Sequence, residues 1–107
     1  MASETRSSPR KNLRAQARVV LPGLAPLKAK TIDISMGGVS LIMAEQLPVG
    51  KSCTVAFEAP LNGNVVRVVA VANVIYTILK GIDGYRTGMQ FVEIDAANNK
   101  ALAELMF

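Results

Sequence analysis

A short polar stretch in this sequence has the residue types and spacing of a small-molecule site. Asp33 and Ser35 stand two apart at the end of a strand-like run, so an extended backbone would point both side chains to one face. The same alternation would place Thr31 on that face as well. Gly37 and Gly38 follow, and glycines allow a sharp turn whose amide groups approach a ligand closely. The stretch therefore predicts a polar turn that offers a carboxylate, a hydroxyl and accessible amides.

Two arginines near the N-terminus supply a complementary chemistry. Arg10 and Arg14 lie ahead of the first apolar run, at the two ends of the stretch RKNLR. Their planar guanidinium groups suit paired hydrogen bonds to phosphate or to the O6 and N7 atoms of guanine, and they can stack on a base. Together with the polar turn, they predict a pocket for an anionic ligand that carries guanine.

The charge distribution is consistent with an anionic partner. The chain has twelve Lys and Arg against eight Asp and Glu, which makes its net charge +4 and its pI about 9.6. Near the N-terminus only Glu4 opposes a run of cationic residues, namely Arg6, Arg10, Lys11, Arg14 and Arg18. A solvated basic tail is the simpler interpretation, but the polar turn offers this segment a partner. We therefore expect residues 1–14 to form a flexible basic arm that carries the paired arginines.

The composition argues against catalysis and metal binding. The chain has no His, which is the commonest general base and the commonest metal ligand. Ser35 has no evident base, and no pair of carboxylates or cluster of metal ligands stands out. The single cysteine, Cys53, stands in an alternating run and is expected in the core. We expect a binding protein with no catalytic residue, no metal and no cofactor.

Length and hydropathy indicate one folded domain. Half of the 107 residues are hydrophobic and the mean hydropathy is +0.31, which suits a chain with a single core. The longest apolar runs, at residues 65–71 and 74–79, are interrupted by polar residues and are too short to span a membrane. Residues 1–14 lack the apolar segment of a signal peptide. We expect a cytoplasmic protein without direct membrane insertion.

Alternating apolar residues, separated by Gly, Pro and Asn, predict a protein built mainly of β-strands. Asn62 and Gly63 favour a tight hairpin, and Asp95 is a candidate N-cap for a helix over residues 96–106. We expect six strands, at residues 15–21, 27–34, 39–43, 51–58, 64–79 and 85–94. This order predicts a small antiparallel barrel over residues 15–107, with the helix packed at one end.

These residues resemble the PilZ domain family, whose members bind the bacterial second messenger cyclic di-GMP. The family signatures are R-x-x-x-R and, further along, [D/N]-x-S-x-x-G, which residues 10–14 and 33–38 match. Residues 88–91, with the sequence GMQF, also resemble a late strand of the family. The resemblance covers nearly the whole chain. It implies a six-stranded split β-barrel of the PilZ type with a C-terminal helix.

The resemblance also implies roles for individual residues. Arg10 and Arg14 would hold the guanine and phosphate groups of cyclic di-GMP from one side. Asp33 would accept hydrogen bonds from N1 and N2 of guanine, which would reject adenine. Ser35 would bond to a base edge or a phosphate, and Gly38, after Gly37, would keep the turn open to the ligand.

Pro9, Lys11 and Arg86 are weaker candidates for the ligand site. Pro9 stands where members that bind two stacked ligand molecules often carry an additional arginine. This departure favours one ligand molecule per site, with Arg6 or Lys11 as the candidate substitutes. Arg86, beside Tyr85, is a further candidate, although an ordinary solvent-facing strand residue is the simpler interpretation.

The function that the resemblance implies is that of a receptor whose basic arm folds onto the barrel when cyclic di-GMP binds. The rearranged surface would then regulate an unknown partner protein or a fused module. One alternative is an interaction module of the PilZ type that needs no ligand, with Asp33 and Ser35 serving only as local caps of the turn. A second alternative is a barrel that binds nucleic acid, but the few aromatic residues stand mostly where burial is expected.

Overall fold

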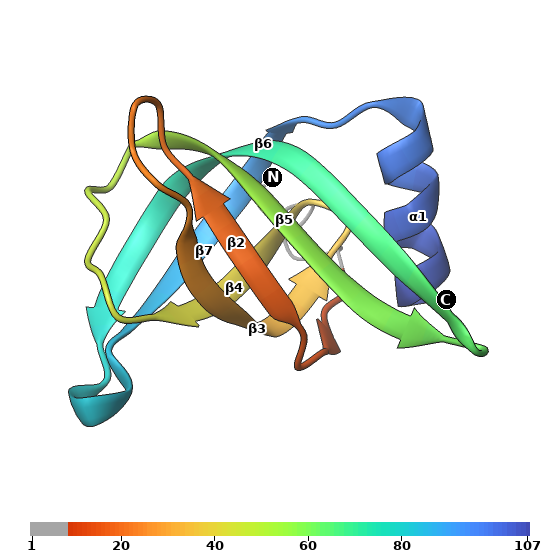
Figure 1. The fold of residues 1–107 in the computed structure, drawn as a ribbon, viewed down its shortest axis with the longest axis horizontal. Helices are drawn as coiled ribbons and strands as arrows, with labels where there is room; N and C mark the ends of the chain where they lie inside the picture. Colours follow the sequence, from red (N-terminus) through yellow and green to blue (C-terminus); the bar gives the residue numbers. More distant parts are fainter. Residues whose placement is uncertain (1–8) are drawn as a thin grey trace, which may run out of the picture.

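Antiparallel pairing joins the strands into one curved sheet that closes on itself (Figure 1). The computed structural model describes residues 9–107. The strand order is β1-β3-β2-β5-β6-β7-β4, and the pairing of β3 with β4 closes the barrel. The elements in chain order are β1 (Lys11–Asn12), β2 (Gln16–Val20), β3 (Leu27–Ser35), β4 (Gly38–Met43), β5 (Ser52–Leu61), β6 (Asn64–Leu79), the 3-10 helix η2 (Gly81–Asp83), β7 (Tyr85–Glu93) and α1 (Ala96–Met106).

The six strands and the helix expected from the sequence are confirmed as β2 to β7 and α1, so the protein is mainly β. The very short strand β1 was not expected. Its two residues, Lys11 and Asn12, are both exposed and pair with Ile34 and Asp33 of β3 through the backbone. No apolar alternation marks such a strand, because it buries neither of its side chains.

The core lies inside the barrel, where the alternating apolar residues of each strand meet. In β2, Ala17 and Val19 are buried while their neighbours are exposed. Cys53 of β5 is 3% exposed, as expected, and burial raises the pKa of its thiol. The largest fully buried apolar side chains of the strands are mostly branched and aliphatic: Phe57, Ile34, Leu41, Met89, Val19, Val39, Val55, Val68 and Val74.

The hairpin between β5 and β6 forms where the sequence predicts it. Asn62 has a φ of 52° and Gly63 a φ of 82°, and two central residues with positive φ match the right-handed twist of the flanking strands. The strand register runs without a shift from this turn to the pair of Ser52 with Asn73. The hairpin therefore fixes one long side of the barrel.

Helix α1 packs beside β6 and covers one end of the barrel (Figure 1). Asp95 caps it, because its side chain accepts a hydrogen bond of 2.8 Å from the backbone N–H of Asn98. The helix buries Leu102, Leu105 and Met106. No helix in the described part of the chain is long and apolar enough to cross a membrane.

Residues 9–14, the described part of the expected arm, lie against the barrel in this structure. Besides the pairing of β1 with β3, the backbone N–H of Leu13 donates to the carbonyl of Ile32 at 3.1 Å. The Lys11 ammonium donates to the carbonyl of Leu105 in α1 at 2.8 Å. Flexibility of this segment stays a prediction, and Arg6 lies outside the described residues.

Candidate ligand-binding site

A β-bulge in β3 determines where the side chain of Asp33 points. Thr31 pairs with Leu41, but Asp33 pairs with Ser40, so Ile32 is an extra residue without a partner on β4. One inserted residue reverses the alternation of faces. Val39 and Leu41 of β4 belong to the core, so Ser40 between them points to the other face of the sheet. Asp33, which pairs with Ser40, therefore lies on this outer face. The expectation that Thr31 and Asp33 share a face is therefore wrong.

Four residues form a row across the outer face of β3, β4, β7 and β6. The register aligns Asp33 with Ser40, Ser40 with Gly88, and Gly88 with Tyr76. A second bulge, between Val74 and Tyr76 in β6, brings the tyrosine into this row. A Cβ added to Gly88 would lie 2.1 Å from the Tyr76 ring. The absence of a side chain at Gly88 therefore leaves room for the ring at this place on β7.

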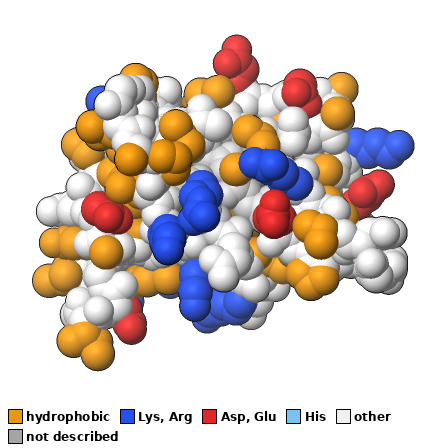
Figure 2. All heavy atoms as spheres, in the orientation of Figure 1, with side chains coloured by type: hydrophobic (Ala, Val, Ile, Leu, Met, Phe, Trp, Pro, Cys, Tyr) orange, Lys and Arg blue, Asp and Glu red, His pale blue; other side chains and the backbone are white. Residues whose placement is uncertain are grey.

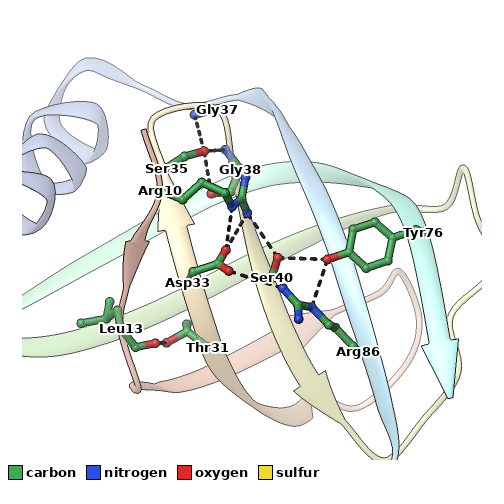
Figure 3. A network of polar contacts seen from close by, with 10 residues as sticks. All are labelled: Arg10, Leu13, Thr31, Asp33, Ser35, Gly37, Gly38, Ser40, Tyr76 and Arg86. Carbon is green, nitrogen blue, oxygen red and sulfur yellow. Dashed lines mark hydrogen bonds and ion pairs between the residues drawn. The ribbon is translucent and has the colours of Figure 1, made fainter. Parts of the chain in front are cut away.

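A network of polar contacts surrounds the carboxylate of Asp33 (Figure 3). Arg10 donates to Oδ1 of Asp33 from Nε at 2.9 Å and from Nη2 at 2.6 Å. Arg86 donates to Oδ2 from Nη2 at 3.4 Å and to the hydroxyl of Tyr76 from Nε at 3.3 Å. Ser40 accepts from Arg10 at 3.2 Å and lies 3.1 Å from the tyrosine hydroxyl.

Two guanidinium groups therefore pair with one carboxylate, so the candidate site has a net positive charge. The side chain of Asp33 is 12% exposed, whereas those of Arg10 and Arg86 are 50% and 35% exposed. Arg10 lies over the carboxylate and reaches solvent itself (Figure 3). An anionic ligand would thus meet the arginines first, and Asp33 only if Arg10 moves aside.

The polar turn that follows β3 is closed by its own serine. The Ser35 hydroxyl accepts hydrogen bonds from the backbone N–H groups of Gly37 at 3.2 Å and Gly38 at 3.1 Å. Packing also requires a glycine at position 38, because a Cβ on Gly38 would lie 2.2 Å from the carbonyl oxygen of Met89. Gly37 is exposed, and an added Cβ would meet nothing within 4 Å. Of the two glycines, only Gly37 therefore has open space beside it.

A cavity of about 680 Å³ lies beside the network, on the side of the polar turn. Its volume is within the range of small-molecule sites. It is lined by residues from the arm, the turn and the outer face of the sheet, among them Arg10, Ser35, Gly37, Ser40, Tyr76 and Gln90. The polar turn and the first arginine of the predicted site therefore meet around one cavity.

Other predicted residues lie outside this cavity. Arg14 is exposed and, within residues 9–107, makes no ion pair or side-chain hydrogen bond with the site. Pro9 is exposed, and Lys11 binds the end of α1. Arg86, in contrast, is not an ordinary solvent-facing residue, because it contacts both Asp33 and Tyr76. Among the described residues, no group of three or more His, Cys, Asp or Glu comes together.

Two residues of the site were missed by sequence reasoning. Neither Ser40 nor Tyr76 was among the residues expected at the site. Both stand in largely apolar strands, and the aromatic residues were expected to be mostly buried. The bulge before Tyr76 turns its ring outward, and a bulge of this kind leaves no clear mark in a run of Val and Ile residues. The local sequence gives one indication of this arrangement, which is Gly88, since a glycine inside a strand often marks a close approach of another group.

Comparisons with known proteins agree with this fold. The PilZ domain model matches residues 4–107. The inhibitor of motility MotI/DgrA of Bacillus subtilis superposes with a TM-score of 0.79 at 17% identity, over 91% of this chain and 47% of that one. The PilZ domain of YcgR from Escherichia coli, solved with cyclic di-GMP, superposes with a TM-score of 0.71 at 16% identity, over 95% of this chain and 88% of that one.

A PilZ domain of CeSA from a cellulose-synthesizing bacterium is also similar, with a TM-score of 0.62 at 19% identity, over 92% of this chain and 94% of that one. At such identities the structural likeness shows the fold. The chain spans about half the length of MotI/DgrA and of the longer YcgR structure, 47% and 44% respectively. No curated protein sequence matches this chain. The family match over nearly all of its residues shows that the chain belongs to the PilZ family of non-catalytic domains.

Proposed function

We propose that this domain is a receptor for cyclic di-GMP and that the cavity beside Asp33 is its binding site. The observation that carries the proposal is the carboxylate of Asp33, which the β3 bulge places on the outer face between two guanidinium groups. YcgR, a structural relative of this chain, has been solved in complex with cyclic di-GMP. A cytoplasmic location is part of the proposal.

Binding would exchange one set of charge-assisted hydrogen bonds for another. The N1 and N2 hydrogens of guanine would take the place of Arg10 at the carboxylate of Asp33. The released guanidinium would then pair with a phosphate or with the O6 and N7 atoms of guanine. Adenine has no donor at the position of guanine N1, so it could not make the same pair of bonds. The ring of Tyr76 offers a surface on which a base can stack.

The exchange would also move the arm. Arg14 lies outside the site in this structure, so its participation requires residues 9–14 to rearrange around the ligand. Such a movement would strain the pairing of β1 with β3 and the contact of Lys11 with α1. The arm and the helix end would then present a different surface to a partner protein or fused module. With Pro9 ahead of the arginines, we propose one ligand molecule per site.

Calorimetric titration with cyclic di-GMP tests the proposal directly. We expect saturable heat at one ligand per domain, and none with cyclic di-AMP. Arg14→Ala should weaken binding on the order of tenfold or more, because a charged partner of the ligand is lost. Arg18→Ala, which removes an exposed arginine of β2, is the matched control and should bind as the wild type does. An absence of heat at high micromolar cyclic di-GMP would reject the proposal.

One observation favours an interaction module that needs no ligand. Arg10 and Arg86 already satisfy the carboxylate of Asp33, and Ser35 already holds the amides of the turn. The charged and polar groups of such a site need no ligand to complete their hydrogen bonds. The same titration separates the two functions. Nucleic-acid binding has less support, because most aromatic rings in residues 9–107 are at least partly buried and Phe107 is the exception, at 86% exposed.

A further inference from the structure

A second group of polar side chains, all but one of them charged, lies on the outer face of β3, β2, β5 and β6. It shares no residue with the candidate ligand site. All of its members are exposed, and we call them the basic face: Gln16, Arg18, Lys28, Lys30, Glu58 and Arg67. Figure 2 shows Lys and Arg side chains gathered over the middle of the side on which β2 and β5 lie in Figure 1, with an acidic side chain among them. Along β3, Lys28 of the basic face lies five residues before Asp33 of the candidate ligand site. At 3.3 Å per residue this separation is roughly 16 Å.

The strand register arranges these residues in two rows. One row runs across all four strands as Lys30, Gln16, Glu58 and Arg67. The next row places Lys28 directly opposite Arg18, which in turn is opposite Ala56. Like charges at directly opposed positions repel each other and destabilise a sheet. An anion bound between them would relieve this repulsion.

A hollow in the sheet surface lies among these side chains. Its volume is about 310 Å³, and Arg18, Glu58 and Arg67 are among the residues that line it. The small side chain of Ala56 leaves room between the longer charged ones. Phe57 beneath it is only 1% exposed, so the hollow offers no aromatic ring on which a base could stack.

We propose that the basic face docks an acidic segment of a partner protein. The carboxylates of that segment would lie along Arg18, Lys28 and Lys30, and one of its side chains would enter the hollow. Glu58 decides between the classes of partner. A nucleic acid or an anionic membrane presents uniform negative charge, which Glu58 would repel, whereas a protein segment can place a lysine or a backbone N–H against it.

The test is a titration of the labelled protein, followed by its amide NMR spectrum, with a short peptide that has alternating glutamates and one central lysine. We expect signals of β2, β3 and β5 to shift, and the shifts to shrink at high salt because exposed charges are screened. A peptide in which every glutamate is replaced by glutamine should cause no shift. An absence of shifts at millimolar glutamate peptide would overturn the proposal.

The variant Arg18→Glu/Lys30→Glu should weaken peptide binding on the order of tenfold or more. It should melt at no lower temperature than the wild type, because a glutamate opposite Lys28 replaces a repulsive pair with an attractive one. The matched control is Lys80→Glu/Lys100→Glu, which changes the net charge equally at two exposed lysines outside the basic face and should bind the peptide as the wild type does.

Two further results would overturn the proposal. One is equal weakening in both double variants, which would mean that only the net charge matters. The other is tighter binding of an oligothymidylate or of phosphatidylglycerol vesicles than of the glutamate peptide. Arg18→Glu/Lys30→Glu should bind cyclic di-GMP as the wild type does, so that the docking proposal and the receptor proposal fail or succeed separately.

Discussion

Asp33 accepts hydrogen bonds from two arginines, and this arrangement determines what a ligand must offer in order to bind there. The side chain of Asp33 is 12% exposed and lies beneath Arg10. A ligand that reaches the carboxylate must replace charge-assisted bonds with bonds of similar strength. The N1 and N2 hydrogens of guanine can do this, because they point in the same direction and match the two oxygens of a carboxylate.

The first prediction concerns the charge of this carboxylate. Asp33→Asn should reduce affinity for cyclic di-GMP by on the order of 2–5 kcal/mol, because an amide offers one acceptor and a competing N–H donor to guanine. Calorimetry measures the loss. Asp83→Asn, at an exposed position of η2, is the control. Unchanged affinity of Asp33→Asn would remove this residue from the site.

The second prediction concerns the place of the Tyr76 ring. Gly88→Ala should displace the ring, since a Cβ there would lie 2.1 Å from it. Tyr76→Ala removes the obstacle, so Gly88→Ala should cost little stability in that background. A double-mutant cycle by urea unfolding should therefore give a coupling on the order of 0.5–3 kcal/mol. Additive effects of the two changes would mean that the ring does not lie over Gly88.

At this scale the sequence identified the chemistry of the site better than its geometry. Arg10, Asp33 and the polar turn could be predicted because their types and spacing form a recognisable pattern. Ser40 and Tyr76 could not, because two bulges determine the direction of Asp33 and Tyr76. A strand pattern has a period of two, so one unpaired residue reverses every later face. Which residue is unpaired depends on the neighbouring strand.

The contact between β4 and β7 holds the polar turn against the barrel. Gly38 pairs with Gln90, and the backbone N–H of Phe91 donates to the carbonyl of Gly37 at 2.9 Å. The strands approach so closely that a side chain at Gly38 has no room. The turn is therefore held in place by two paired strands that lie about fifty residues apart in the sequence but are adjacent in the sheet.

The third prediction separates the two glycines of the turn. Gly38→Ala should lower the free energy of unfolding by about 1–3 kcal/mol, because the new Cβ overlaps the carbonyl of Met89. Gly37→Ala should change it much less, since an added Cβ there meets nothing within 4 Å. Urea unfolding measures both. Equal losses in the two variants would contradict this account of the turn.

The fourth prediction concerns the cap of α1 and its dependence on pH. Hydrogen bonds from the backbone and side chain of Asn98 lower the pKa of Asp95 below its usual value of 3.8. Its contribution to stability is therefore present above that value and is lost as the pH falls through the lowered pKa. Asp95→Ala should melt at a lower temperature than the wild type at pH 7.

The difference between Asp95→Ala and the wild type should shrink on acidification below pH 3.8, because the wild-type cap is then protonated as well. Asp83→Ala, without a capping contact, is the control for a general effect of charge. A difference in melting temperature that stays constant from pH 7 to pH 2 would mean that the carboxylate of Asp95 does not stabilise the helix.

The elements were the part of the fold that the sequence predicted best. Helix α1 begins and ends where its cap and apolar stripe place it, and the hairpin at Asn62 and Gly63 has the positive φ values that its residues favour. These signals are local, so one stretch of sequence contains them. Strand β1 could not be found in this way, because it is held only by backbone pairing with β3.

In the whole molecule, the arm connects the sheet to the helix. Residues 9–14 reach the carboxylate of Asp33 through Arg10 and the end of α1 through Lys11. The ammonium of Lys11 also lies favourably at the negative end of the helix dipole. A ligand that draws Arg10 from Asp33 would thus affect both contacts. The contact of Lys11 with α1 could not be predicted from the sequence, because it depends on where the helix packs against the barrel.

The fifth prediction tests the central claim, which is that cyclic di-GMP brings the arm and the polar turn together. Amide NMR spectra of the labelled protein should be recorded as cyclic di-GMP is added. We predict that the signals of residues 10–14 and 35–38 shift together and saturate at one ligand per domain, while cyclic di-AMP leaves them in place. Signals in both stretches that stay unchanged in excess cyclic di-GMP would contradict the account.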